Sequence, residues 1–313
     1  MRLLGVELNR LLSRRAVIVL MLLGALGIGA VAVGVLYDGR PPTGAELQNV
    51  QQQADFYNTR LERRHERLGC DGSTDSRPRC RERRIEADEF LYRDQISLRQ
   101  YRGWLLPMAA VAAVVAFLFG ATFVGADIAS GSLGTQLLFQ PSRNAVWVAK
   151  AGALLIGAAG FGAVTLGLAY VALYAFVRGW GQPIPPSVLG EYGEAVGRCV
   201  ALTAVAAVLG YAVALIARHT AAALGVVAVY GLVAEALLRQ LWAGSERWLL
   251  SNHVAAVVGG RFKVTTFPDD DCYRLRCRVI FHFSPAFAAC YLGAGAAVVL
   301  AISWLVFRRR DVP

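Results

Sequence analysis

The residues of this chain that could do chemistry are few and widely separated. Glu235 lies inside an apolar run, and Arg239 follows four residues later, which is the spacing of side chains that pair on a helix. An ionisable side chain within a membrane-spanning run is costly and is a functional candidate by default. Two interpretations stay open: an ion pair near the outer membrane interface, or a Glu235 carboxylate that lines a translocation path.

The motifs of common hydrolytic and nucleotide-binding enzymes are absent from the sequence. It contains no G-x-x-x-x-G-K-[ST], no H-E-x-x-H and no G-x-S-x-G, and its four histidines fall in different segments. We therefore predict that the chain is not an enzyme and has no nucleotide-binding site or cofactor of its own. An intramembrane transferase or hydrolase is the enzymatic alternative, but it would lack a cluster of nucleophile, base and metal ligand.

Four cysteines fall in two polar segments, Cys70 with Cys80 and Cys272 with Cys277. Of the three pairings that four cysteines allow, the local one is simplest, because each bond would close a short polar loop. A zinc site is the alternative, but the spacings are not C-x-x-C and no histidine pair accompanies them. We predict two local disulfides and no metal site.

The composition of the chain is that of a membrane protein. Of its 313 residues 56% are hydrophobic, and its mean hydropathy is +0.46. Runs of about 20 apolar residues are long enough to cross a bilayer as helices, and these runs do not alternate polar and apolar residues as barrel strands do. The sequence predicts an all-α polytopic membrane protein with six transmembrane helices, at 16–37, 104–125, 146–178, 195–217, 220–241 and 286–307.

Basic residues indicate the orientation of these spans. The net charge is +10, and many arginines flank span ends on one side, which the positive-inside rule makes the cytoplasmic side. This predicts cytoplasmic N- and C-termini, with a short tail at 308–313, and it disfavours nucleic-acid binding as the reason for the basic charge. A cleaved signal peptide is an alternative for the first run, which is longer than a typical signal-peptide core.

Residues 1–15 are predicted to form a helix in the membrane interface. Leucines at positions 4, 8, 11 and 12 define its apolar face, and Glu7, Arg10 and Arg14 are expected away from that face. A plain basic flank without a helix is the alternative.

Two long segments lie outside the membrane in this topology. In 38–103, apolar residues recur every three or four positions before a turn at Cys70–Cys80, and Leu91 and Leu98 lie a heptad apart after it. This pattern predicts an extracellular antiparallel helical hairpin. The segment 243–285 is predicted to contain a short helix followed by two short strands, Val264–Phe267 and Val279–Phe283.

The polar helical segment 126–145 lies between the second and third spans and is too amphipathic to cross a bilayer. It resembles the same region of permeases of the type-2 ATP-binding-cassette exporter family. There an acidic residue at the span end precedes a G-T-(x)-x-L-L turn, Pro-(Ser)-Arg and a lysine that opens the third span. The matching positions are Asp127, Gly134, Thr135, Leu137, Leu138, Pro141, Arg143 and Lys150. The six spans also resemble the family, whereas the long segment 38–103 departs from its usual short loop.

The resemblance implies an activity and a set of partners. The segment 126–145 would be a cytoplasmic coupling helix seated on a separate ATP-binding-cassette ATPase subunit, present in two copies and holding ATP and Mg. The permease would pair with a second copy of itself, or with a related permease, among membrane lipids. Together they would export a hydrophobic or amphipathic drug, lipid or peptide. Contacts with the ATPase are expected at Asp127, Gly131, Leu133, Gly134, Thr135, Leu137, Leu138, Phe139, Pro141, Arg143 and Lys150.

Alternatives to these expectations stay open. Arg143 and Lys150 could instead bind lipid phosphates or act only as topology signals. The preference for arginine over lysine indicates a high-GC bacterial source, and therefore a bacterial plasma membrane. The alternative function is a membrane-anchored sensor or assembly protein that binds a partner through its extracellular hairpin.

Overall fold

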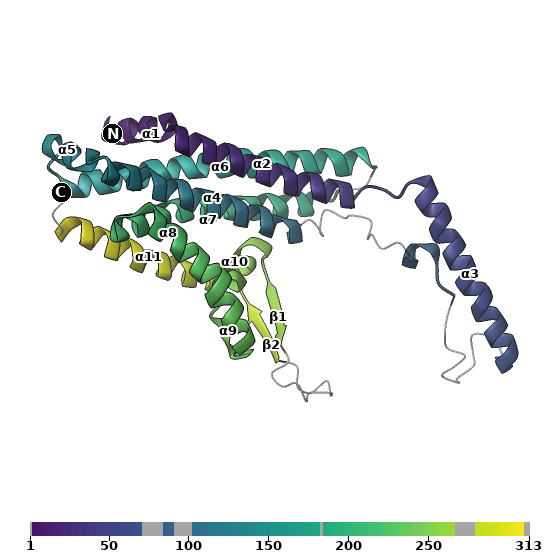
Figure 1. The fold of residues 1–313 in the computed structure, drawn as a ribbon. Coiled ribbons are helices and arrows are strands. Elements are labelled where there is room, and N and C mark those ends of the chain that lie inside the picture. Colours follow the sequence, from purple (N-terminus) through teal and green to yellow (C-terminus); the bar gives the residue numbers. More distant parts are fainter. Residues whose placement is uncertain are drawn as a thin grey trace. The chain divides into compact units, whose positions relative to one another are not determined.

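The computed structural model describes residues 2–70, 84–90, 102–181, 184–241, 243–266 and 279–309, which are mostly helical. The chain falls into two compact units, a smaller one at Gly34–Ser97 and a larger one formed by Met1–Val33 with Leu98–Pro313 (Figure 1). Each unit is held together by contacts of its own.

Six helical segments in the described part of the chain are long and apolar enough to cross a membrane. A helix suits this environment because it satisfies its backbone N–H and C=O groups internally. The finding is consistent with a multi-pass membrane protein. The segments are α2 (Arg15–Asp38), α4 (Arg102–Ala129), α6 (Arg143–Gly179), α7 (Pro186–Ala217), Thr220–Leu241 and α11 (Pro285–Arg309).

The helices extend beyond the apolar runs from which they were predicted. α7 begins at Pro186 rather than at 195, and proline is tolerated at a first helical position because the N–H it lacks would be unpaired there. α4 continues to Ala129, so that Asp127 lies in its last turn. The predicted segment 126–145 is consequently divided among the end of α4, the short helix α5 (Ser132–Phe139) and the start of α6.

α7 lies between α4, α6 and α11 and contacts each of them (Figure 1). Where α4 and α7 cross, Gly120 faces the backbone of Ala207 and Gly210 faces the backbone of Phe117. A Cβ atom at either glycine would overlap the facing carbonyl group. Small residues allow two membrane helices to approach backbone to backbone, and this crossing uses one glycine from each side.

The N-terminal helix α1 (Arg2–Ser13) packs against α6, with Leu11 beside Gly157. Its predicted faces are wrong in two positions: Glu7 is fully buried, and Leu12 is 50% exposed. The reason is geometric. With 3.6 residues per turn, position 7 falls among the leucines at 4, 8 and 11, which form the face toward α6.

The fifth candidate span is interrupted. α8 (Thr220–Ala228) passes into a π-helical turn, η4 (Val229–Ala234), and then into α9 (Glu235–Leu241). π-helical turns are rare and shift the register of the side chains that follow them. The apolar run predicts one continuous span and gives no sign of this turn.

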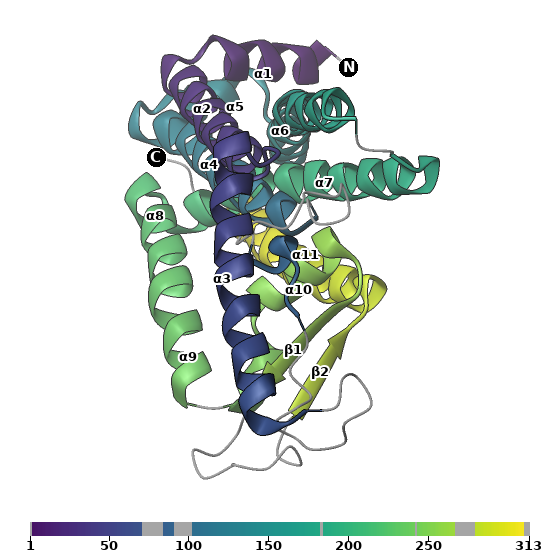
Figure 2. The same cartoon turned by 90° about the vertical axis from the view of Figure 1, so that its right-hand side faces the viewer.

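The segment between the fifth and sixth spans contains the helices η5 (Ala243–Arg247) and α10 (Leu250–Gly259). It also contains the strands β1 (Phe262–Thr266) and β2 (Val279–Phe283), which pair antiparallel with Phe262 opposite Phe283 (Figure 2). The two strands lie within two residues of the predicted ones. The described fold is thus mostly helical with one two-stranded sheet, so that "all-α" is an incomplete description.

The smaller unit is built on α3 (Gly44–Leu68). Thr43 and Glu46 form a reciprocal capping box at its start, in which the Thr43 backbone N–H donates to the Glu46 Oε2 at 2.8 Å. Gly69 ends the helix in the left-handed conformation with φ 59°, which glycine adopts without a Cβ penalty.

The described part of the predicted second hairpin arm is not a continuous helix. Residues 84–86 are not helical, and a single 3-10 turn, η3 (Ala87–Phe90), follows them. The Asn58 side chain accounts for this: its amide bonds both the N–H and the C=O of Ile85 at 3.0 Å, which occupies backbone groups that a helix would need.

The rest of the predicted arm, at 91–101, lies outside the described residues. Cys80, Cys272 and Cys277 also lie outside them, so that both disulfide pairings stay predictions.

Candidate functional site

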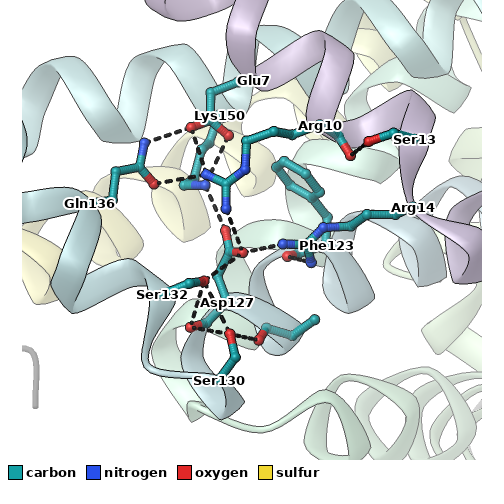
Figure 3. Close-up of polar contacts among 11 residues, drawn as sticks. Glu7, Arg10, Ser13, Arg14, Phe123, Asp127, Ser130, Ser132, Gln136 and Lys150 are labelled. Carbon is teal, nitrogen blue, oxygen red and sulfur yellow. Dashed lines mark hydrogen bonds and ion pairs between the residues drawn. The ribbon is translucent and has the colours of Figure 1, made fainter.

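A group of polar residues in the larger unit converges where α1, α4, α5 and α6 meet (Figure 3). Lys150 of α6 lies at the centre, with its Nζ 2.6 Å from the Asp127 Oδ2 and 2.9 Å from the Glu7 Oε2. All three residues are 0% exposed. Ionised side chains removed from water are stable only when they are paired and hydrogen-bonded, and here one lysine pairs with two carboxylates.

Two arginines complete this charge cluster, which we define as Glu7, Arg10, Arg14, Asp127 and Lys150. Arg10 bridges both carboxylates, at 3.3 Å from Glu7 and 3.4 Å from Asp127. Arg14 pairs with Asp127 and also donates to the Phe123 carbonyl oxygen at 2.8 Å. The cluster therefore holds three cations and two carboxylates, and carries one net positive charge.

The ring of Phe123 supports the cations of the cluster. The Arg14 guanidinium lies 4.9 Å from the ring centroid and the Lys150 ammonium 5.0 Å from it. The negative face of an aromatic ring attracts cations most strongly when they are desolvated. Phe123 precedes Asp127 by one helical turn, so that α4 contributes both the carboxylate and the ring.

The helix α5 is joined to the charge cluster by two polar side chains. Gln136 donates to the Glu7 Oε1 at 2.6 Å and accepts from Arg10 at 3.3 Å. Ser132 donates to the Asp127 Oδ1 at 3.1 Å. Gly131 makes the turn between α4 and α5 at φ 67°, a conformation that glycine adopts readily.

The apolar residues of α5 divide between the interior and the surface. Leu133 is 4% exposed, whereas Leu138 is 83% and Phe139 is 86% exposed. These two have the highest exposed fractions among the large apolar side chains of the described residues. The end of α5 therefore presents a pair of uncovered apolar side chains, while its start is held to the protein.

The structure brings only some of the predicted contact residues together. Asp127 and Lys150 lie in the charge cluster, buried, and so are not available to touch another protein directly. Arg143 starts α6 and donates to the carbonyl oxygens of Phe307 and Arg308, at 3.3 and 3.4 Å. A cation at a helix C-terminus is favourable, and here it ties α6 to the end of α11. The remaining predicted residues, Gly134, Thr135, Leu137 and Pro141, lie in α5 or within two residues of its end and are not members of the charge cluster as defined above.

Glu235 and Arg239 do not pair with each other in the described structure. The Glu235 carboxylate accepts from the backbone N–H of Ser251 at 2.8 Å, and Arg239 donates to the Ser251 Oγ at 2.7 Å. Both side chains therefore hold the start of α10. The predicted i,i+4 ion pair is wrong because the N-terminus of a nearby helix, with its unpaired N–H groups, competes for the carboxylate.

The side chains of the charge cluster are bonded to one another and to polar side chains of α5. Within the described ranges, no group of three or more His, Cys, Asp and Glu side chains is arranged to hold a metal ion. The carboxylate oxygens of the charge cluster are occupied by ammonium, guanidinium, hydroxyl and amide donors. These bonds connect side chains of α1, α4, α5 and α6.

The sequence alone did not predict Glu7, Arg10, Arg14, Ser132 or Gln136 as members of this site. A signal for Glu7 was present, because it interrupts the apolar stripe of α1 at helical spacing. Ser132 and Gln136 carry no such signal, since each gains its role only when α5 folds back against α1 and α4.

No protein-family model matches this chain, and no curated protein or solved structure is similar enough to be matched.

Proposed function

We propose that this chain is the permease subunit of an ATP-driven exporter of the type-2 ATP-binding-cassette kind. Its α5 would be the coupling helix that contacts a separate ATPase subunit. The observation that carries the proposal is the exposed pair Leu138 and Phe139 on a short helix between two candidate spans. Large apolar side chains gathered on a surface are typical of a binding site for another protein.

The charge cluster supports this proposal because its bonds connect α5 to α1 and α6, so that a displacement of one helix acts on the others. A displacement of α5 reaches α1 through the bond between Gln136 and Glu7, and reaches α6 through Asp127 and Lys150. Coupling requires a contact whose free energy differs between two global states. A buried set of charges is suited to that requirement, because its pairs are costly to break singly.

In this proposal the ATPase holds the ATP and Mg, and two permeases act with two ATPase subunits. The substrate is a hydrophobic or amphipathic molecule, moved outward across a bacterial plasma membrane. The arginine-rich span ends and both termini are placed in the cytoplasm by the positive-inside rule. Glu235, which starts α9 and accepts from the N–H of Ser251 in α10, is proposed to lie along the substrate path.

Co-purification tests the proposal. The affinity-tagged chain should bring down a nucleotide-binding subunit that hydrolyses ATP, in equal amount. Leu138→Glu and Phe139→Glu should each reduce the recovered ATPase at least about tenfold, since a buried charge in the contact would cost more than 1.4 kcal/mol.

The matched control is Leu47→Glu, because Leu47 is also exposed but lies on α3 in the smaller unit. It should leave the recovered ATPase unchanged. Equal recovery with all three variants, or recovery of a partner without ATPase activity, would contradict the assignment of α5.

A further inference from the structure

The fifth candidate span holds the start of α10 through two side chains, Tyr230 and Glu235, which we call the external cap. The Tyr230 hydroxyl accepts from the Leu250 N–H at 3.0 Å. The Glu235 carboxylate accepts from the Ser251 N–H at 2.8 Å. Leu249, at the N-cap position of α10, has no side-chain oxygen that could accept from either group. The external cap therefore satisfies N–H groups that the N-terminus of α10 cannot satisfy by itself.

The spacing of Tyr230 and Glu235 does not suit a regular α-helix. With 3.6 residues per turn, side chains five positions apart point about 140° away from each other. In η4, however, the Glu235 N–H donates to the Tyr230 carbonyl oxygen, five residues back, and this bond closes a wider turn. The π-helical turn thereby places both residues one turn apart on the same face of the span, where they reach neighbouring N–H groups of α10.

Packing by neighbouring helices does not explain why this turn is π-helical. Among the described side chains of the turn, Val229 and Val233 are 61% and 47% exposed, and no side chain of α9 is buried. A Cβ atom added at Gly231 would meet nothing within 4 Å. The bonds of the external cap do offer an explanation, because they join the turn to α10, which packs against α4, α7 and α11.

We propose that η4 is a register device that fastens α10 to the fifth candidate span only while the π-helical turn is present. The turn takes up one extra residue, so that Tyr230 and Glu235 act on α10 together. In a regular α-helix of the same residues, Tyr230 would keep its place, because α8 is held by α4 and α7. Glu235 would turn away, and the Ser251 N–H would lose its partner. The device is independent of the proposed function of α5.

Two variants at one position of the purified chain in lipid nanodiscs test the device. Deletion of Val233 leaves Tyr230 and Glu235 four residues apart, which is the spacing of neighbours on a regular α-helix. The external cap should re-form without a π-helical turn, and amide exchange at Ser251 should stay within about threefold of the unaltered chain. This variant should melt no lower than the unaltered chain, because a regular turn replaces a rare one.

The matched control is insertion of one alanine after Val233. It places Tyr230 and Glu235 six residues apart, which is about 120° from each other on an α-helix. Amide exchange at Ser251 should become at least about tenfold faster, as expected for the loss of a hydrogen bond to a charged group. The two variants change the length of the span by one residue each, so only the register distinguishes them.

A further substitution shows whether the external cap has re-formed in the deletion variant. Glu235→Ala should speed exchange at Ser251 in that variant by the same factor as in the unaltered chain, within about threefold. This pair of measurements decides the question even if the insertion variant does not fold.

Three results would each overturn the register device: a deletion variant that unfolds or exposes Ser251, equal exchange in the deletion and insertion variants, or a Glu235→Ala change without effect. None of these measurements uses an ATPase. A failed co-purification would therefore reject the proposed function of α5 and leave the register device unaffected.

Discussion

The larger unit holds two polar clusters among apolar helices, and they differ in how their charges are satisfied. In the charge cluster, Glu7, Asp127 and Lys150 are fully buried. Lys150 pairs with both carboxylates, and the remaining donors to them come from two arginines and from polar side chains of α5. The second cluster is formed by Glu235, Arg239, Glu246 and Ser251. Its Arg239 side chain is 40% exposed, lies 3.4 Å from Glu246 and donates to the Ser251 Oγ at the start of α10. Loss of one charge in the first cluster strands its partners, whereas solvent or lipid head groups can replace a lost partner in the second.

Lys150→Met should produce the largest effect, because it leaves two buried carboxylates with only the arginines and neutral donors. We expect a loss of about 3–5 kcal/mol of stability, as for other broken buried pairs. The measurement is the melting temperature and the yield of monodisperse protein. Lys263→Met is the control, since the other lysine of the chain is exposed on β1 and its loss should change stability by less than about 0.5 kcal/mol. Equal losses for both variants would show that the burial and pairing of Lys150 do not set its contribution to stability.

Glu235→Gln should have an intermediate effect confined to the second cluster. The amide oxygen can still accept from the Ser251 N–H, but the favourable interaction of a negative charge with the N-terminus of α10 is lost, at about 1 kcal/mol. Hydrogen exchange should speed up in Leu250–Gly259 and stay unchanged in α1 and α5. Faster exchange in all three helices would mean that the clusters are coupled.

Tyr230→Phe should have the smallest effect. The Tyr230 hydroxyl accepts from the Leu250 N–H at 3.0 Å, and at 36% exposure its place can be taken by water or a lipid head group. We expect a loss of about 0.5 kcal/mol, visible as faster exchange at the first turn of α10 only. An effect larger than that of Glu235→Gln would reverse the ranking of the two contacts and make the hydroxyl the main anchor of α10.

Much of the helical architecture could be predicted from the sequence because apolar runs report membrane spans directly. The six runs lie within the six long apolar helices. The β-branched and aromatic residues near Val264 and Val279 placed both strands closely. Such signals are local, since they depend on composition and on spacing within one element.

The features that could not be predicted depend on contacts between distant elements. The burial of Glu7 depends on Lys150, which lies 143 residues along the chain. The conformation at Ile85 depends on its hydrogen bonds to Asn58. Glu235 does not pair with Arg239 because it bonds to the start of α10 instead. A repeat pattern in one segment gives no information about such partners. Of the charge cluster, only Asp127 and Lys150 were predicted to be functional residues, and both were expected to contact an ATPase subunit rather than each other.

The crossing of α4 and α7 has a mechanical consequence. Backbone contact at two points, Gly120 and Gly210, resists both sliding and rotation, so the two helices should travel as a single body. From Asp127 this body extends about 30 Å to Pro107, where the missing N–H interrupts the helical ladder and allows a bend. A displacement of α4 at Asp127 would therefore be carried along α4 and α7 together as far as Pro107, where α4 can bend.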